Sequence, residues 1–199
     1  NETKDKGIKP TPTIGGVGLI KNYKKMVTMN LKKKDNLILV IGKTEGHIEQ
    51  SSFARNILNE KKGPPPEINL FNEKNNGETI LKLIDNRLIS SAHDVSLGGI
   101  ITAVSKMAIK GKKGFKLNKP KVLINKFDYY FGEDQGRYII EIEPKNLSKV
   151  QKILKDNSVH YDEIGLVAEK DVIIDKEPII HIDDLIKSNK YWLADYMDK

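Results

Sequence analysis

The feature that most restricts the fold of this chain is a run of apolar residues at positions 37–42, with the sequence LILVIG. Because apolar and polar side chains do not alternate along it, the run is typical of a buried strand that ends at a glycine. A second run at positions 137–143, RYIIEIE, does alternate, with Tyr138, Ile140 and Ile142 on one face. The chain therefore contains a sheet with at least one strand inside its core.

The remaining segments predict helices and strands in irregular alternation. Helical spacing of apolar residues, with capping and stop signals, predicts helices at residues 51–60, 69–87, 98–109 and 146–156 and a terminal helix from 183. Short apolar segments predict strands at residues 89–95, 115–124, 127–131, 163–169 and 171–174. Because the elements do not alternate regularly and the last strands form a hairpin, we expect an α+β fold with a mixed sheet rather than a strictly doubly wound fold.

Composition excludes several classes of protein. The 199 residues include no cysteine, which excludes structural disulfides, cysteine-based zinc sites and thiol mechanisms. No apolar run approaches the ~20 residues of a membrane span, and no segment at the start is typical of a signal peptide. With 38% hydrophobic and 31% charged residues, the chain has the composition of an ordinary soluble protein. We expect a globular protein of the cytoplasm with no membrane partner.

The first residues of the chain predict a linker or tail from an upstream domain. Residues 1–9 are polar and show no periodicity, so we interpret them as a linker or tail and residues 10–199 as one domain. The chain does not begin with Met, so we expect it to be a fragment of a longer polypeptide or a processed chain.

The positive charge does not indicate a nucleic-acid partner. The formal net charge is +7, but it comes from 31 lysines and only 3 arginines. Proteins that read nucleic acids favour arginine for bidentate contacts and interleave aromatic residues for stacking. We therefore predict a lysine-rich soluble surface and no nucleic-acid binding.

Residues 91–99, SAHDVSLGG, are the first candidate site. Asp94 lies at the end of a predicted strand, and the glycine pair opens a predicted helix. A carboxylate can hold Mg²⁺ while the amides of a helix N-terminus bind phosphate oxygens. The alternative is that Asp94 or Ser96 only caps the helix and that the glycines only permit close packing.

Three further loops are candidates. Residues 131–137, FGEDQGR, place two carboxylates, an amide and an arginine in one turn that could hold a metal or a polar substrate. The alternative is a surface ion pair between Glu133 and Arg137. Residues 13–18, TIGGVG, and residues 42–46, GKTEG, are glycine-containing loops that do not match a Walker A or dinucleotide pattern, and both are also typical of plain turns.

Recognised catalytic sets are missing from the sequence. No Ser/His/Asp set can be proposed, and the four histidines show no metal-ligand spacing. From the residues alone, we therefore expect only an α+β domain with polar, glycine-containing loops for a magnesium–phosphate ligand.

The order of these loops resembles one enzyme family. The segments PTPTIGGVG, VIGKTEG, PPP, SAHDVSLGG and FGEDQGR occur in the same order as in the C-terminal part of phosphoribosylformylglycinamidine synthase subunit II, and the tail YWLADYM also matches. That enzyme belongs to the aminoimidazole ribonucleotide synthetase superfamily. The resemblance extends from about residue 9 to the end, and it implies a three-layer α/β/α-like domain with a mixed sheet, the superfamily's C-terminal domain type.

The resemblance also implies a reaction. The synthase converts formylglycinamide ribonucleotide and glutamine-derived ammonia to formylglycinamidine ribonucleotide, with ATP and Mg²⁺, in purine biosynthesis. The implied partners are the upstream domains of the same polypeptide, a glutaminase subunit, a small accessory subunit and the ribonucleotide substrate. The family's catalytic histidine lies upstream, so we expect no catalytic residue in this chain and no activity from it alone.

The motifs shared with the family imply roles for individual residues of this chain. The resemblance implies nucleotide contacts for Asp94 and Gly132, a metal contact for Glu133 and a substrate contact for Gln135. It also implies a phosphate loop at Gly15 and Gly16. The chain departs from the family at Leu97, where an acidic residue is usual, which leaves a second carboxylate role in that turn in doubt.

Two alternatives to a catalytic contribution remain open. The chain could be a scaffold or auxiliary nucleotide-binding domain of the same synthase. It could also belong to a related enzyme, such as aminoimidazole ribonucleotide synthetase or selenophosphate synthetase, although the proline triplet and the tail favour the formylglycinamide enzyme.

Overall fold

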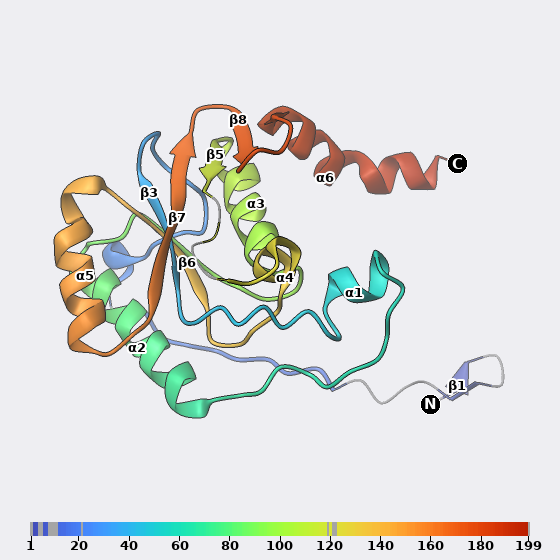
Figure 1. The fold of residues 1–199 in the computed structure, drawn as a ribbon, viewed down its shortest axis with the longest axis horizontal. Coiled ribbons are helices and arrows are strands. Elements are labelled where there is room, and N and C mark those ends of the chain that lie inside the picture. Colours follow the sequence, from blue (N-terminus) through green and yellow to red (C-terminus); the bar gives the residue numbers. More distant parts are fainter. Residues whose placement is uncertain are drawn as a thin grey trace.

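The computed structural model in Figure 1 describes residues 2–3, 6–7, 12–20, 22–118, 120 and 123–198. Two short strands, β1 (Glu2–Thr3) and β2 (Lys6–Gly7), pair as an antiparallel hairpin. The rest of the expected linker at residues 1–9 and its boundary with the domain lie outside the described residues. Residues 12–20, here called the N-terminal arm, are exposed and belong to no helix or strand.

In the described part of the chain, the domain is built on a seven-stranded sheet with the order β4, β6, β3, β7, β5, β8, β9. These strands are β3 (Leu37–Ile41), β4 (Ser91–Asp94), β5 (Gly114–Leu117), β6 (Tyr138–Ile142), β7 (Tyr161–Ala168), β8 (Asp171–Ile174) and β9 (Ile180–His181). Neighbouring strands are antiparallel, except that β5 and β8 are parallel. The predicted mixed sheet is therefore confirmed.

The apolar run at residues 37–42 forms the central strand. β3 pairs with β6 on one side and with β7 on the other. Its residues 38–41 have no exposed surface, so both faces of the strand are covered. The prediction of a buried strand at this position is confirmed.

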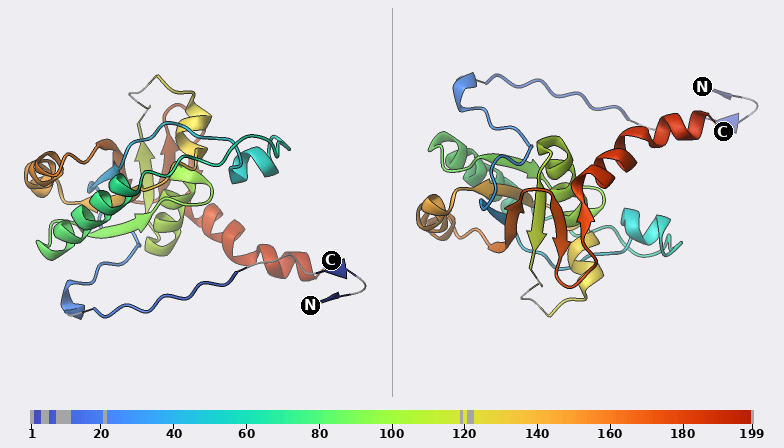
Figure 2. Two further views of the ribbon diagram at one scale, coloured as in Figure 1. Left: turned by 90° about the horizontal axis from the view of Figure 1, so that it is seen from below. Right: turned by 90° about the horizontal axis from the view of Figure 1, so that it is seen from above.

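Helices cover both faces of the sheet, which gives the three layers visible in Figure 1 and Figure 2. One face packs against α2 (Leu70–Asp85) and α5 (Leu147–Asp156). The other face packs against α3 (Gly99–Gly111), α4 (Lys126–Phe131) and the first half of α6 (Ile182–Met197). Each face has its own hydrophobic core. Among the described residues, no helix has the length and apolar character required to cross a bilayer.

Three shorter helices lie outside these layers. The helix α1 (Ser52–Asn56) is shorter than the helix predicted at 51–60, although its predicted serine cap is present, because Ser51 Oγ accepts a hydrogen bond from Ala54 N at 3.0 Å. The 3-10 helices η1 (Tyr23–Lys25) and η2 (Pro144–Asn146) precede β3 and α5, respectively.

The aromatic segment at residues 127–131 forms the helix α4 and not the predicted strand. Asn125 caps this helix, because its Oδ1 accepts a hydrogen bond from Phe127 N at 2.8 Å. Tyr129 and Tyr130 are buried in the core shared with α3, so tertiary packing overrides the strand preference of aromatic residues. The strand predicted at 115–124 is also shorter, since β5 ends at Leu117, and residues 119, 121 and 122 lie outside the described part.

A buried carboxylate fixes the segment that enters β3. Glu141 on β6 has no exposed surface. Its Oε1 accepts hydrogen bonds from Lys33 N at 3.0 Å and Asn36 Nδ2 at 2.7 Å. Its Oε2 accepts from Lys32 N at 2.9 Å and Ser91 Oγ at 2.8 Å. This one side chain therefore joins β6, the edge strand β4 and the loop before the central strand.

The buried tyrosines of α4 are expected to make the folded domain less stable at alkaline pH. Burial, assisted by Asp175, raises the pKa of Tyr130 to about 12, and burial also raises the pKa of Tyr129. A tyrosine in an unfolded chain ionises near pH ~10. The neutral hydroxyls therefore stabilise the fold fully below pH ~10, and this contribution is lost as the pH rises through the folded-state values.

Thermal melting of the protein across this alkaline range measures the effect. We expect Tyr130→Phe to reduce the pH dependence, because phenylalanine has no group to ionise. Tyr23→Phe is the matched control, since the Tyr23 side chain is exposed. A melting temperature that stays constant from pH ~8 to pH ~12 would contradict the prediction.

Candidate functional site

Three of the candidate loops meet at one edge of the sheet. β6 is antiparallel to both β3 and β4, and its first residue, Tyr138, pairs with the last residue of each, Ile41 and Asp94. The end of β3, the end of β4 and the start of β6 therefore lie together. This brings the loops at 42–47, 94–99 and 131–137 to the same edge of the sheet.

Glycines permit the loops to touch through their backbones. Gly99 has a φ of +68°, and a Cβ atom built there would lie 2.6 Å from Tyr130 O and 2.7 Å from Gly132 O. A Cβ on Gly132 would lie 2.4 Å from Asp128 O and 3.1 Å from Gly46 Cα. Both positions need glycine for packing. The contact that the resemblance implied between Gly132 and nucleotide stays a prediction.

Asp134 binds the loop that follows β3. Its carboxylate accepts hydrogen bonds from three successive amides, those of Glu45 at 3.2 Å, Gly46 at 3.1 Å and His47 at 3.0 Å. A carboxylate that accepts several backbone N–H bonds holds a loop in one conformation. Asp134 itself is buried, so these bonds lie largely out of water.

Arg137 is buried beside Asp134 and does not form the surface pair with Glu133 that we considered. Its Nη1 lies 3.5 Å from Asp134 Oδ2 and donates to Thr44 Oγ1 at 3.1 Å. Its Nε and Nη2 donate to the carbonyl oxygens of Asp134 at 3.1 Å and Gly132 at 2.7 Å. Burial lowers the pKa of Arg137, whereas Asp134, Tyr129 and Glu133 act in the opposite direction. The guanidinium therefore joins the loops on both sides of it.

Glu133 binds the start of two helices. Its Oε1 accepts hydrogen bonds from Ser52 N at the start of α1 and from Gly98 N before α3, both at 2.7 Å. Gly98 is the N-cap residue of α3, in a left-handed conformation and with no side-chain cap. The alternative in which Asp94 or Ser96 caps α3 is therefore wrong. We call Glu133, Asp134 and Arg137 the clamp, because together they bind the loops around this edge.

Asp94 lies at the surface. It ends β4, which is the edge strand of the sheet, and its side chain is 63% exposed, with Oδ1 3.1 Å from His93 Nδ1. Asp94 therefore ends a strand, as predicted, and this strand lies at the edge of the sheet. The pKa of the Tyr138 hydroxyl is raised by burial and by the carboxylates of Glu73 and Asp94, which flank it. Asp94 thus belongs to an acidic surface around Tyr138, and its contact with nucleotide stays a prediction.

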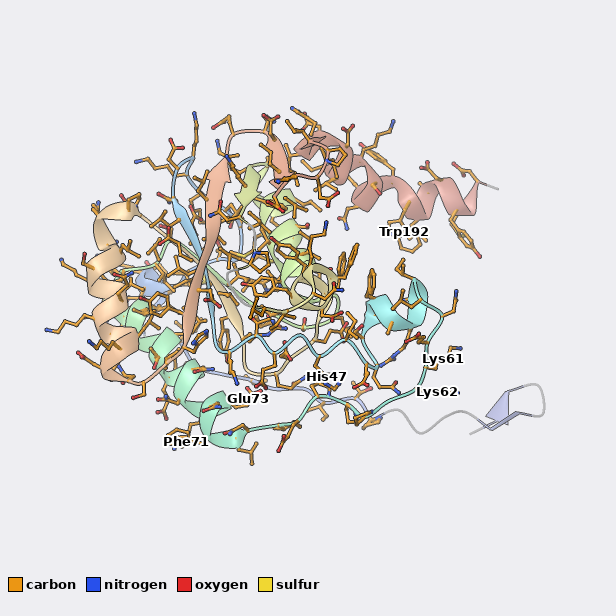
Figure 3. The ribbon with its side chains drawn as sticks, in the orientation of Figure 1. His47, Lys61, Lys62, Phe71, Glu73 and Trp192 are labelled. Atoms are coloured by element: carbon orange, nitrogen blue, oxygen red, sulfur yellow. The ribbon has the colours of Figure 1, made fainter. Side chains whose placement is uncertain are left out.

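Gln135 faces a cleft of about 880 Å³ at this edge. The cleft is lined mainly by polar groups from the loop after β3, the start of α2 and the residues before β7, including His47, Glu73 and His160. Figure 3 shows His47 and Glu73 on the same side of the domain, below the end of β3. The proline triplet at residues 64–66 also lies at this cleft, because Pro66 lines the cleft and Pro64 O lies 3.0 Å from His47 Nε2.

The sequence does not indicate several residues of the cleft. Glu73, Asn72 and Asn76 come from the first turns of α2, whose sequence shows only the apolar spacing of a helix. Asn76 Nδ2 donates to Gly136 O at 2.9 Å, which ties α2 to the loop that carries Gln135. No short-range pattern in the sequence indicates this contact, since the two residues are 60 positions apart.

The glycine-rich loop lies apart from the cleft. Gly15 and Gly16 belong to the exposed N-terminal arm, and a Cβ atom at either would have no atom within 4 Å. The structure does not bring them together with Gln135 or Asp94, so a phosphate contact for them stays a prediction. Among the described residues, no group of three or more His, Asp or Glu side chains is arranged to hold a metal ion.

The family model for the C-terminal domain of AIR synthase related proteins matches residues 33–176. The chain belongs to this family. The match includes the sheet from β3 to β8 and all three loops of the cleft edge. The three-layer arrangement of this AIR synthase-related domain agrees with the fold expected from the order of the motifs.

Curated relatives align with the whole chain. The phosphoribosylformylglycinamidine synthase subunit PurL of Pelagibacter ubique (strain HTCC1062) is 70% identical over 198 residues, which is 100% of this chain and 27% of that protein. PurL of Rhodopseudomonas palustris (strain HaA2) is 36% identical over 197 residues, which is 99% of this chain and 27% of that protein. The AIR synthase-related domain thus spans about a quarter of the length of these relatives.

A solved structure confirms the fold. Thermotoga maritima PurL complexed with FGAR superposes with a TM-score of 0.68 at 20% identity, over 82% of this chain and 30% of that chain. At this identity the likeness concerns the fold and not the roles of individual residues.

Proposed function

We propose that the chain is the C-terminal domain of a phosphoribosylformylglycinamidine synthase of the subunit II type. This enzyme would convert formylglycinamide ribonucleotide and glutamine-derived ammonia to formylglycinamidine ribonucleotide, with conversion of ATP to ADP and phosphate, in the purine pathway of the cytoplasm. The observation that supports this most is the 70% identity to Pelagibacter ubique PurL along the entire chain. Two motif loops, at residues 42–46 and 131–137, line the same polar cleft, and the third motif loop lies at the same edge of the sheet, which supports the proposal independently.

ATP and two further subunits belong to the same proposal. Other Thermotoga maritima structures are described as PurL complexed with ATP and as PurLQS. By analogy, the full polypeptide that contains this domain binds ATP and assembles with a glutaminase subunit and a small accessory subunit. Its upstream domains supply the catalytic residues.

Within this chain, the cleft binds and orients rather than catalyses. The amides of Gln135 and Asn72 can donate and accept hydrogen bonds with a ribonucleotide, and His47 can donate or accept at the cleft wall. Asp94 and Gly132 are proposed to contact the nucleotide from the neighbouring loops, and Gly15 and Gly16 a phosphate group. Correct placement of reactants is itself a large part of the catalysis of phosphoryl transfer.

Magnesium, when bound, neutralises charge on the transferred phosphoryl group. Mg²⁺ needs about six oxygen ligands in near-octahedral geometry. Glu133 already accepts two backbone hydrogen bonds through Oε1, and the described residues offer no group of three carboxylate or imidazole ligands. The described residues therefore do not fit a complete magnesium site, and a metal contact by Glu133 requires further ligands.

A supporting role is the second candidate function. The clamp favours it, because the carboxylates of Glu133 and Asp134 already accept hydrogen bonds from backbone amides. In that case the domain shapes and stabilises the synthase without touching ligand.

Substitution of Gln135 in the full-length synthase separates the two functions. We expect Gln135→Ala to raise the KM for formylglycinamide ribonucleotide about 3–10-fold, the effect of losing one or two neutral hydrogen bonds. Asp94→Asn is expected to weaken ATP binding. Gln151→Ala on α5, away from the cleft, is the matched control. Unchanged kinetics in both variants would leave only the supporting role.

The 199-residue chain alone is expected to form no amidine when ammonia, ATP and the ribonucleotide are supplied. The reason is that the proposed catalytic residues lie outside it. Product formation above the uncatalysed level by the purified chain would contradict the proposal.

A further inference from the structure

The helix α6 is packed over only half of its length. Its first turns contact α3 and β9, with Ile182 fully buried and Leu185 and Ile186 against the core. Its last turns extend beyond the body of the domain (Figure 1, Figure 2). They expose large apolar side chains, namely Tyr191, Trp192, Leu193, Tyr196 and Met197, each at least 48% accessible.

The exposed residues continue the buried stripe of the same helix. Ile182, Leu185 and Ile186 are followed at helical spacing by Leu193 and Tyr196, which lie 11 and 14 positions after Ile182. Asn189 interrupts this face once, so the exposed residues form a second apolar patch beyond it, for which the described domain offers no covering surface. Because isolated helical turns are only marginally stable in water, the outer turns need a surface that α3 does not reach.

A second apolar surface faces the same space. Phe53 of α1 stacks on Phe131 and Phe127 of α4, with ring centroids 4.6 and 5.8 Å apart, and half of Phe127 is exposed. Ile57, directly after α1, is 64% exposed. Figure 3 shows Trp192 pointing from α6 toward α1.

We propose that the outer half of α6 and the aromatic stack of α1 and α4 form one docking surface for another part of the same polypeptide. This rests on the proposed function, because it takes the chain to be part of a longer synthase. The relatives are almost four times as long as this chain, so most of the enzyme lies outside it. The N-terminal arm runs from η1 toward the end of the domain at which the outer half of α6 lies (Figure 1, Figure 2), and it exposes Ile14, Val17 and Leu19.

A second copy of the chain fits the surface less well. Each copy has a formal net charge of +7, so two copies repel each other at low ionic strength. An intramolecular partner, in contrast, is held close by the chain itself and gains from a high effective concentration.

Photo-crosslinking in the full-length synthase tests the docking surface. p-Benzoylphenylalanine replaces Trp192 in one protein and Lys187 in a second, matched protein, in which the label lies on the opposite side of α6. After irradiation, the crosslinked peptides are identified by mass spectrometry, and the synthase activity of both proteins is measured. We expect the label at position 192 to react within the same polypeptide, outside this 199-residue segment, at a yield several-fold above the label at 187.

Three results would overturn the proposal: crosslinks mainly to a second copy, crosslinks mainly to another subunit, or a yield equal to that at position 187. An inactive enzyme with the expected crosslink would contradict the proposed function alone, and an active enzyme without it would contradict the docking surface alone. A further comparison uses Leu193→Glu and Ala194→Glu, which add the same charge on and off the stripe. We expect only Leu193→Glu to lower the melting temperature of the full-length enzyme by several degrees.

Discussion

Replacing Arg137 with leucine is expected to lower the free energy of unfolding by about 3–5 kcal/mol, the typical result of removing one partner of a buried ion pair. The substitution leaves the Asp134 carboxylate without its guanidinium and leaves the Gly132 carbonyl without its donor. For a domain of this size, the loss corresponds to a fall in melting temperature of about 6–20 °C. Arg137→Lys is expected to recover only part of it, because an ammonium group cannot reproduce the three contacts of the planar fork.

Thermal melting and chemical denaturation of the purified chain measure this change. Arg55→Leu is the matched control, because Arg55 lies on α1 with an exposed side chain. A loss below about 1 kcal/mol for Arg137→Leu, the range of exposed ion pairs, would show that the clamp is not a major stabilising element.

Replacing Glu141 with alanine is expected to destabilise the chain by a similar amount, about 3–5 kcal/mol. Four donors that now bind its carboxylate would lose their acceptor, and two of them, on Asn36 and Ser91, are buried. Each buried donor that is left unsatisfied costs about 1–3 kcal/mol before the structure relaxes. Glu141→Gln preserves the shape of the side chain but turns an amide NH₂ toward some of these donors. We therefore expect it to lower the free energy of unfolding less than Glu141→Ala does, but still measurably. Denaturant unfolding gives the free energies.

The control for this series is Glu163→Ala on β7, where the glutamate is exposed. Equal effects of Glu141→Ala and Glu163→Ala would contradict the role assigned to the buried carboxylate.

Much of the fold follows from local patterns. The apolar run at 37–42 and the alternation at 137–143 predict the two strands at the centre of the sheet, because burial alone determines such patterns. The aromatic run at 127–131 is different. Its aromatic side chains favour a strand, but the cap at Asn125 and the packing of the tyrosines beside α3 make it a helix.

The candidate site was predicted as a set of loops but not atom by atom. The sequence indicates the loops after β3 and β4 and the loop before β6 as separate candidates, and the pairing of β6 with both β3 and β4 brings them together. Which carboxylate of residues 133–134 pairs with Arg137, however, depends on backbone amides from α1, α3 and the loop at 45–47. Every residue except proline carries a backbone amide, so the sequence does not show which amides will bind a given carboxylate. Their positions arise only in the folded chain.

The central position of β3 has a consequence for how the domain forms during synthesis. β3 is the first strand of this sheet to be synthesised, yet its two partners, β6 and β7, lie about a hundred residues or more further along the chain. Contacts of such high sequence separation form slowly, because a long loop must close first. Until both partners emerge, the apolar run at 37–41 remains unpaired, and it resembles the exposed segments through which nascent chains aggregate. Chaperone dependence during translation should therefore concentrate in the interval between synthesis of β3 and synthesis of β7.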